Sequence, residues 1–137
     1  MATADREGMG ERVFVCDDDD GYRILLREVL GAAGMQIVGE GGDGEACSEA
    51  VAQADPDVVL VDLNMPGTNG FEALPLFRAS APHAKLIVLA TAPADQQSVS
   101  AARMLGADGY VSKPFDIFAV PSLVREALAS EPHWRTP

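Results

Sequence analysis

Five polar residues directly follow short runs rich in apolar residues, at positions that could bring their side chains to one point. They are Asp17, Asp18, Asp62, Thr91 and Lys113. Three carboxylates within about 5 Å of one another repel by roughly 3 kcal/mol per pair at an effective dielectric near 20. Lys113 adds one positive charge, so a divalent cation is needed as well. A site with few protein ligands, all of them oxygens, fits Mg²⁺ or Mn²⁺ better than Zn²⁺.

A carboxylate beside a divalent cation, an ammonium group and a hydroxyl group is suited to phosphoryl transfer onto that carboxylate. The positive groups offset charge on the phosphoryl oxygens, and the protein mainly positions the reacting groups. Aspartate is an accepted nucleophile that forms an aspartyl phosphate. Because an acyl phosphate is reactive, the modification is transient, which suits signalling.

The elements that must position these residues follow from the apolar pattern. Strands are expected at 12–16, 36–39, 58–61, 86–90 and 110–112, and segments with helical spacing lie between and after them. Asp43 is placed to cap the second helix, and Gly34 to end the first in a left-handed conformation. The alternation predicts an α/β fold, a doubly wound five-stranded parallel sheet with helices on both faces. Sites in such folds form beyond the carboxyl ends of the strands, where the strand order reverses.

Some local features of the helices can also be predicted. Asp20 is expected to cap the first helix, with Asp19 left in solvent. Pro75 and Pro121 fall within helical segments, so each helix should start late or kink at its proline. The fourth helix, at about 95–105, carries only a thin apolar stripe that includes Met104, and it should be loosely held.

The composition of the chain indicates one acidic globular domain. The 137 residues carry a formal net charge of −11, which argues against direct binding of nucleic acid. The absence of a long apolar stretch argues against membrane insertion and secretion, so a cytoplasmic location is expected. Cys16 and Cys47 should be reduced and buried. We expect a loose N-terminal extension at 1–11, a domain at 12–130 and a short tail at 131–137.

Four segments together resemble the receiver domains of two-component response regulators. The match covers nearly the whole chain, in the family's order and spacing. The segments are VFVCDDD at 13–19, DVVLVDLNMPG at 57–67, LATA at 89–92 and GADGYVSKPF at 106–115. The loop sequences at 37–44 and 64–67 are similar to receivers that are often followed by a helix-turn-helix output domain.

The resemblance implies a role for each residue of the acidic site. Asp62 would accept the phosphoryl group. Asp18 would bind Mg²⁺ directly, Asp17 mainly through water, and Asn64 through its backbone carbonyl. The cofactor would therefore be Mg²⁺, with Mn²⁺ as a substitute.

The resemblance also implies roles for residues at the last two strands. Thr91 and Lys113 would contact phosphoryl oxygens. Tyr110 matches the aromatic residue whose rotamer follows phosphorylation while Thr91 moves inward. The Lys113–Pro114 peptide bond matches one that is usually cis in the family, as only proline makes that form accessible.

The implied function is that of a phosphoacceptor switch, not of an enzyme with an external product. A histidine kinase or a phosphotransfer protein would donate to Asp62, and the surface of the fourth helix, fifth strand and fifth helix would change for a protein partner or a homodimer. Whether the chain is a complete regulator or is joined to an output domain stays open.

Three other functions deserve comparison. A phosphatase of the haloacid dehalogenase type needs a second aspartate where this chain has Asn64. A flavodoxin-like flavin binder would not place four aspartates, 17–20, against the phosphate of the flavin. A receiver-like interaction module that works without phosphorylation stays as the alternative.

Overall fold

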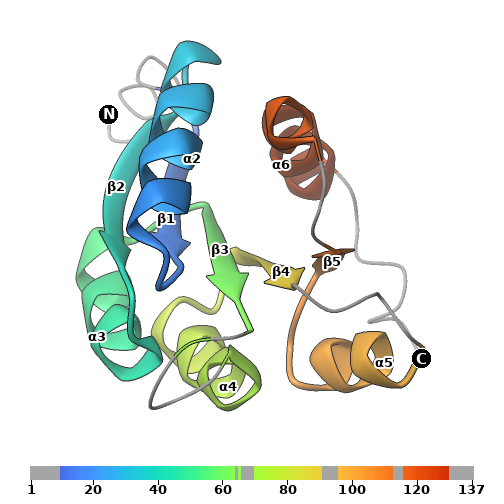
Figure 1. Ribbon diagram of the computed structural model, residues 1–137. Helices are drawn as coiled ribbons and strands as arrows, with labels where there is room; N and C mark the ends of the chain where they lie inside the picture. The colour runs from blue at the N-terminus through green and yellow to red at the C-terminus, as the bar shows by residue number, and fades with distance from the viewer. Residues whose placement is uncertain (1–9, 64, 66–69, 91–95, 113–115, 130–137) are drawn as a thin grey trace.

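The computed structural model describes residues 10–63, 65, 70–90, 96–112 and 116–129. Strands and helices alternate along the chain (Figure 1). The strands are β1 (Arg12–Cys16), β2 (Gln36–Gly41), β3 (Val58–Asp62), β4 (Lys85–Ala90) and β5 (Gly109–Ser112). The helices are α2 (Asp20–Ala32), α3 (Gly44–Ala54), α4 (Gly70–Ser80), α5 (Gln96–Met104) and α6 (Val120–Ala129), and a short 3₁₀ turn, η1 (Ile117–Ala119), precedes α6.

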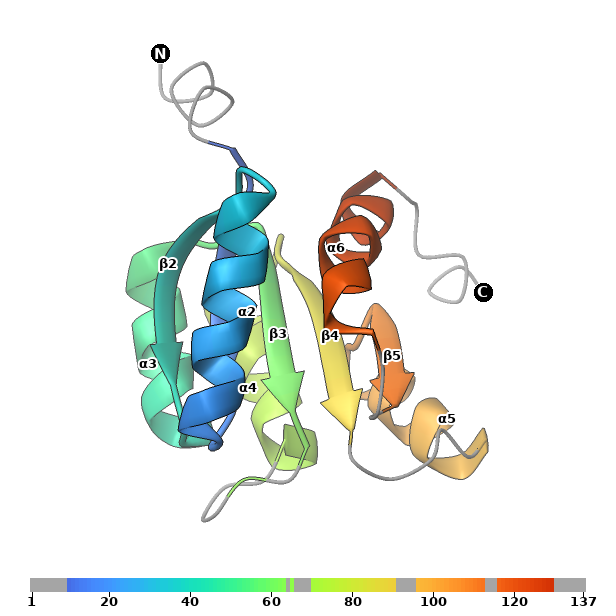
Figure 2. The ribbon, with the colours of Figure 1, turned by 45° about the horizontal axis from the view of Figure 1, so that its top comes forward.

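The five strands form one parallel sheet in the order β2-β1-β3-β4-β5. Helices α2 and α6 cover one face, and α3, α4 and α5 cover the other (Figure 2). The chain passes from β1 outward to β2 and then returns to β3 on the other side of β1. The strand order therefore reverses between β1 and β3, and the predicted doubly wound α/β fold is confirmed.

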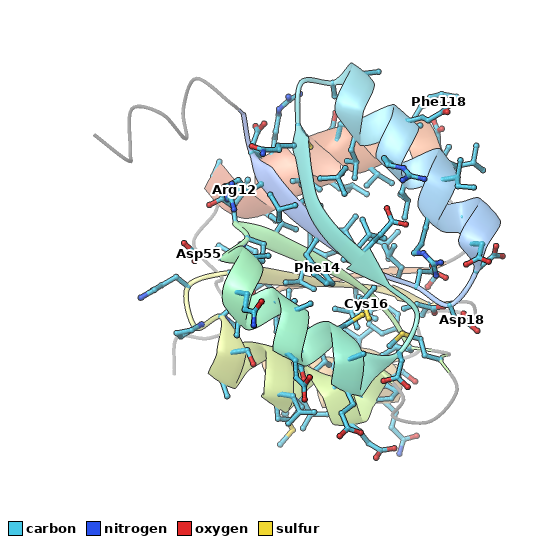
Figure 3. All side chains as sticks on the ribbon, turned by 90° about the vertical axis from the view of Figure 1, so that its left-hand side faces the viewer. Arg12, Phe14, Cys16, Asp18, Asp55 and Phe118 are labelled. Atoms are coloured by element: carbon cyan, nitrogen blue, oxygen red, sulfur yellow. The ribbon has the colours of Figure 1, made fainter. Side chains whose placement is uncertain are left out.

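The core consists of two apolar layers, one on each face of the sheet. Every residue of β3 is buried, as expected for a central strand that is covered on both faces. Phe14 projects from β1 into the layer shared with α3 and α4, where Phe77 is also fully buried (Figure 3). The opposite layer contains Leu26 and Leu30 of α2. The two layers fix the strands, and hence the residues that follow them.

Both helix-capping features that flank β2 occur as predicted. The Asp43 carboxylate accepts hydrogen bonds from the amides of Glu45 and Ala46, at the start of α3. Gly34 follows α2 with φ of 88°, and its amide donates to the Gly31 carbonyl while the Met35 amide donates to Leu30. This pair of bonds is the Schellman motif, which satisfies carbonyls that the helix end leaves without a partner.

The predicted cap of α2 was wrong by one residue. Asp19, not Asp20, has the extended backbone of a cap, and its carboxylate accepts from the Tyr22 amide at 3.1 Å. Asp20 is the first residue of the helix, where a negative charge is favourable because the helix dipole is positive there. Asp19 is therefore a structural residue and not a free surface group.

The two prolines behave differently from each other. Helix α6 begins at Val120 with Pro121 in its first turn, so its start is late, as predicted, and proline is well tolerated there. Helix α4 begins at Gly70 and contains Pro75, so a late start is wrong for α4, and the alternative of a kink at Pro75 stays a prediction. The Pro75 ring faces solvent while neighbouring Leu74 is fully buried, and burial of the apolar side chains holds the helix together.

Met104 does not pack against the sheet as the apolar stripe suggested. Its side chain is 86% exposed, and Ala102 is the buried residue within α5, all of which is described. The expectation of a loosely held helix agrees with this small buried surface. No helix among the described residues is long and apolar enough to span a membrane.

Two glycines, one inside the last turns of α2 and one just after its end, predict opposite effects of the same substitution. Gly34→Ala should lower the free energy of unfolding by about 1 kcal/mol, because an L-residue is strained at positive φ. Gly31→Ala should raise it by about 0.5 kcal/mol, because Gly31 lies within the helix and nothing lies within 4 Å of the added carbon. Urea denaturation followed by circular dichroism measures both changes, and equal signs would contradict this account of the helix end.

Candidate functional site

The ends of β1 and β3 place two carboxylates side by side. Cys16 pairs with Val61 across the two parallel strands, so Asp17 and Asp62 occupy the next positions of neighbouring strands. The Asp17 amide donates to the Gly41 carbonyl at 2.9 Å, which extends the pairing of β1 with β2 by one residue. Asp18 then leaves the sheet at the point where the strand order reverses.

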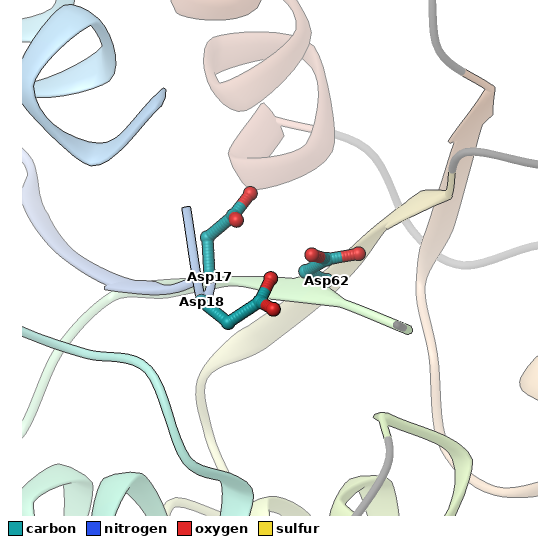
Figure 4. Close-up of side chains that lie close together, drawn as sticks. All are labelled: Asp17, Asp18 and Asp62. Atoms are coloured by element: carbon teal, nitrogen blue, oxygen red, sulfur yellow. The ribbon is translucent and has the colours of Figure 1, made fainter. Parts of the chain in front are cut away.

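Asp17, Asp18 and Asp62 form one group of carboxylates. One oxygen from each residue lies within 4.8 Å of the others. Figure 4 shows the three side chains at the ends of β1 and β3, with the carboxylate of Asp18 facing that of Asp62. Asp17 is fully buried and Asp62 is 2% exposed, whereas Asp18 is exposed to solvent. The site therefore has a buried floor and one ligand at its opening.

The three residues fit a small, hard divalent cation. All three supply carboxylate oxygens, which such ions prefer. Bonds of about 2.1 Å place opposite ligands roughly 4 Å apart, so oxygens that lie within 4.8 Å need only small rotations to share one ion. A bound cation would also remove the repulsion among the carboxylates. Among the described residues this is the group of acids that could hold a metal ion.

The other two aspartates of the acidic run face elsewhere. Asp19 caps α2, and its amide donates to the Asp17 carboxylate at 2.9 Å. Asp20 forms an ion pair with Arg23, one turn further along the helix. Of the four aspartates, Asp17 and Asp18 thus belong to the carboxylate group, and Asp19 and Asp20 belong to the start of α2.

Tyr22 is a neighbour of the site that the sequence did not reveal. Partial burial and the negative charges of Asp17 and Asp19 raise the pKa of its hydroxyl group. The phenol therefore stays neutral at physiological pH and adds no charge to the acidic group. Its position follows from helical geometry, because it lies one turn after the cap Asp19.

The two cysteines are free and buried, as expected. Cys16 ends β1 directly before Asp17, and its Sγ lies 3.5 Å from the Sδ of Met65. A hydrogen bond with Cys47 and burial raise the pKa of the Cys16 thiol. A neutral thiol at this point adds no further charge beneath the carboxylates.

The structure brings together three of the residues predicted for the site and leaves others undescribed. Tyr110 lies in β5, is partly buried and packs against the apolar layer on the side of α3, α4 and α5. Its predicted switch role stays a prediction. The remaining candidates, Asn64, Thr91, Lys113 and Pro114, lie outside the described residues.

Comparison with known proteins agrees with the observed fold. The family model described as "Response regulator receiver domain" matches residues 13–125. The chain is 36% identical to the chemotaxis protein CheY of Thermotoga maritima over 88% of this chain and 96% of that protein. It is 32% identical to the sporulation initiation phosphotransferase F of Bacillus subtilis, over 88% and 95%. The solved receiver domain of the regulator NarL from Mycobacterium tuberculosis superimposes with a TM-score of 0.81 at 25% identity, covering 89% of this chain and 98% of that one.

Proposed function

Because the chain belongs to the response regulator receiver domain family, we propose that Asp62 accepts a phosphoryl group from a histidine kinase or a phosphotransfer protein. The observation that carries this proposal is the place of Asp62. Its carboxylate is nearly buried at the end of the central strand β3, with oxygens of Asp17 and Asp18 within 4.8 Å. A nucleophile is thus held beside a group that fits a divalent cation.

In the proposed reaction, a carboxylate oxygen of Asp62 forms a bond to phosphorus while the nitrogen–phosphorus bond of the donor phosphohistidine breaks. The leaving imidazole takes up a proton. Asp17, Asp18, Asp62 and the backbone carbonyl of Asn64 would hold Mg²⁺, which offsets the negative charge of the phosphoryl oxygens when it is bound. Thr91 and Lys113 would contact the same oxygens. Water later attacks the acyl phosphate, so the protein loses the modification by its own chemistry.

The signal would leave through the surface of α5, β5 and α6. Thr91 follows β4 and Tyr110 lies in β5, so a shift of the two residues would reach α5 directly. Helix α5 buries little surface of its own, and an element with few buried contacts is displaced at low cost. Helix α5 would have one position in the unphosphorylated chain and another in the phosphorylated chain. A partner protein, or a second copy of the chain, would bind one of these states better and so shift the equilibrium between them.

The same switch could operate alone or within a larger protein. The nitrate/nitrite response regulator NarL of Escherichia coli is 31% identical, and the match covers 55% of its length. An attached output domain is therefore one target of the switch, and a separate protein is the other. The net charge of −11 disfavours nucleic acid as a direct ligand of this chain.

Incubation with acetyl phosphate and Mg²⁺ tests the proposal. Intact-mass measurement should show the uptake of one phosphoryl group, and hydroxylamine should release it, because an acyl phosphate reacts with that nucleophile. A chelator should prevent the uptake, and Mn²⁺ should restore it. A protein that stays unmodified with saturating Mg²⁺ would instead favour the receiver-like module that works without phosphorylation.

A further inference from the structure

The guanidinium group of Arg23 connects three segments next to the carboxylate group. It donates to the backbone carbonyl of Asp17, at the end of β1. It also pairs with the Asp20 carboxylate of its own helix and with the Glu40 carboxylate of β2, the latter at 3.3 Å. The Arg23 side chain is 17% exposed, so most of this contact is shielded from solvent.

The loop after β2 is shaped to admit this side chain. A carbon atom added to Gly42 would lie 3.1 Å from Nη1 of Arg23 and 3.3 Å from the Cα of Asp18. Both distances are closer than ordinary van der Waals contact. Glycine at this position therefore lets the guanidinium group and the Asp18 backbone pack against the same loop.

The contacts of Arg23 affect both the metal-binding part and the helix part of the acidic run. The Asp17 carbonyl belongs to the peptide group that joins Asp17 to Asp18, so its hydrogen bond fixes the orientation of that peptide and the direction in which both side chains leave the backbone. The pair with Asp20 holds a further carboxylate on the helix surface.

We propose that Arg23 is a positioning residue for the divalent cation, an inference that rests on the proposed function. It holds the Asp17–Asp18 peptide in the orientation that binds the ion. It touches neither the ion nor the phosphoryl group. Outer residues that orient metal ligands change metal affinity by about 10- to 100-fold when they are removed.

The sign of the effect separates positioning from simple electrostatics. A nearby positive charge repels a cation, so removal of that charge alone would tighten cation binding. Loss of positioning would weaken it. The charge of Arg23 is balanced by Asp20 and Glu40, which reduces its repulsion of the ion. We therefore expect the positioning effect to dominate.

Calorimetric titration of Mg²⁺ into Arg23→Ala should give a dissociation constant about tenfold higher than in the wild-type protein. Arg27→Ala is the matched control. Arg27 lies one turn further along α2 and pairs with the same Glu40 at 3.4 Å, and its removal changes the net charge equally. The ion pair of Arg27 with Glu40 does not involve the three aspartates of the site, so the Mg²⁺ affinity of Arg27→Ala should stay within about twofold of wild type.

Arg23→Lys keeps the charge but loses the planar fork that binds several acceptors at once, so its affinity should fall between the other two. The Mg²⁺ concentration for half-maximal phosphorylation should rise in parallel with the dissociation constant, whereas the maximal rate at saturating Mg²⁺ should not change. Arg23→Lys also serves if Arg23→Ala fails to fold.

Unchanged or tighter binding in Arg23→Ala, or equal weakening in Arg27→Ala, would overturn the inference while leaving the proposed function intact. Normal affinity in Arg23→Lys would also overturn it, because the planar fork that contacts several acceptors at once would then not be needed to position the ligands. Failure of the wild-type protein to bind Mg²⁺ would instead count against the proposed function itself.

Discussion

Asp62→Asn should remain folded and take up no phosphoryl group from acetyl phosphate, even with saturating Mg²⁺. Asparagine has nearly the same shape as aspartate, but its neutral amide oxygen is a poor nucleophile and does not form an acyl phosphate. The expected loss is complete at the sensitivity of intact-mass measurement. Because Asp62 lies at the end of a fully buried strand, a change of shape is the main risk to folding, and this substitution avoids it.

Glu49→Gln is a suitable control for Asp62→Asn. Glu49 is exposed on α3, away from the ends of the strands, and its replacement removes the same single negative charge. This variant should be phosphorylated like the wild-type protein. Peptide mapping of the wild-type protein should locate the phosphoryl group on Asp62. Its appearance on Asp17 or Asp18, or persistent uptake by Asp62→Asn, would rule out the assignment.

The sheet and the carboxylate group could be predicted because both depend on simple regularities. Short apolar runs that alternate with helices indicate a parallel sheet, and parallel strands end at one edge. The adjacency of Asp17 and Asp62 then follows from the pairing of β1 with β3. This prediction needed no side-chain detail, because the pairing of the backbone strands alone brings Asp17 and Asp62 next to each other.

The helices show where such reasoning reaches its limit. Asp19 and Asp20 are equally good capping residues, and the choice between them depends on one pair of backbone angles at Asp19. Proline inside a helix costs about 3 kcal/mol, yet burial of Leu74 and Phe77 in α4 outweighs this cost at Pro75. Tertiary packing, which a local pattern does not contain, decided that outcome.

Arg23 could not have been assigned to the site from the sequence. Its spacing from Asp20 predicts an ion pair on the helix surface. Its other two partners are Asp17, directly after β1, and Glu40 in β2, and they meet Arg23 only after the sheet has formed. Sequence spacing does not predict a residue whose contacts come from several helices and strands at once. It does predict which residues stand at the ends of strands.

A second large effect is expected on stability. Arg78→Leu should lower the free energy of unfolding by about 3–5 kcal/mol, because it removes the arginine that is paired with a buried carboxylate. Nη2 of Arg78 lies 2.9 Å from Oδ2 of Asp108, whose side chain is 3% exposed. The same carboxylate oxygen accepts from the Leu86 amide at 2.9 Å, so Asp108 cannot easily turn outward to solvent.

The position of this ion pair explains why its loss should be costly. Arg78 lies in the last turn of α4 and also donates to the carbonyls of Ala84 and Gly106, at 2.8 and 2.7 Å. It therefore joins α4 to the segments that enter β4 and β5. Tyr110, the predicted switch residue, lies in β5. Loss of the contacts that join α4 to β5 should therefore also increase the mobility of Tyr110.

Two further variants separate the buried charge from the lost hydrogen bonds. Asp108→Asn in the Arg78→Leu background should recover part of the stability, since a neutral amide oxygen can still accept from the Leu86 amide without the cost of a buried charge. Arg125→Leu, which removes a more exposed pair with Glu11, should cost about 1 kcal/mol. Urea denaturation at neutral pH measures all three variants. If Arg78→Leu were no more harmful than Arg125→Leu, the ion pair would not be a main support of the fold, and the coupling of α4 to β5 would have to arise from the apolar layer alone.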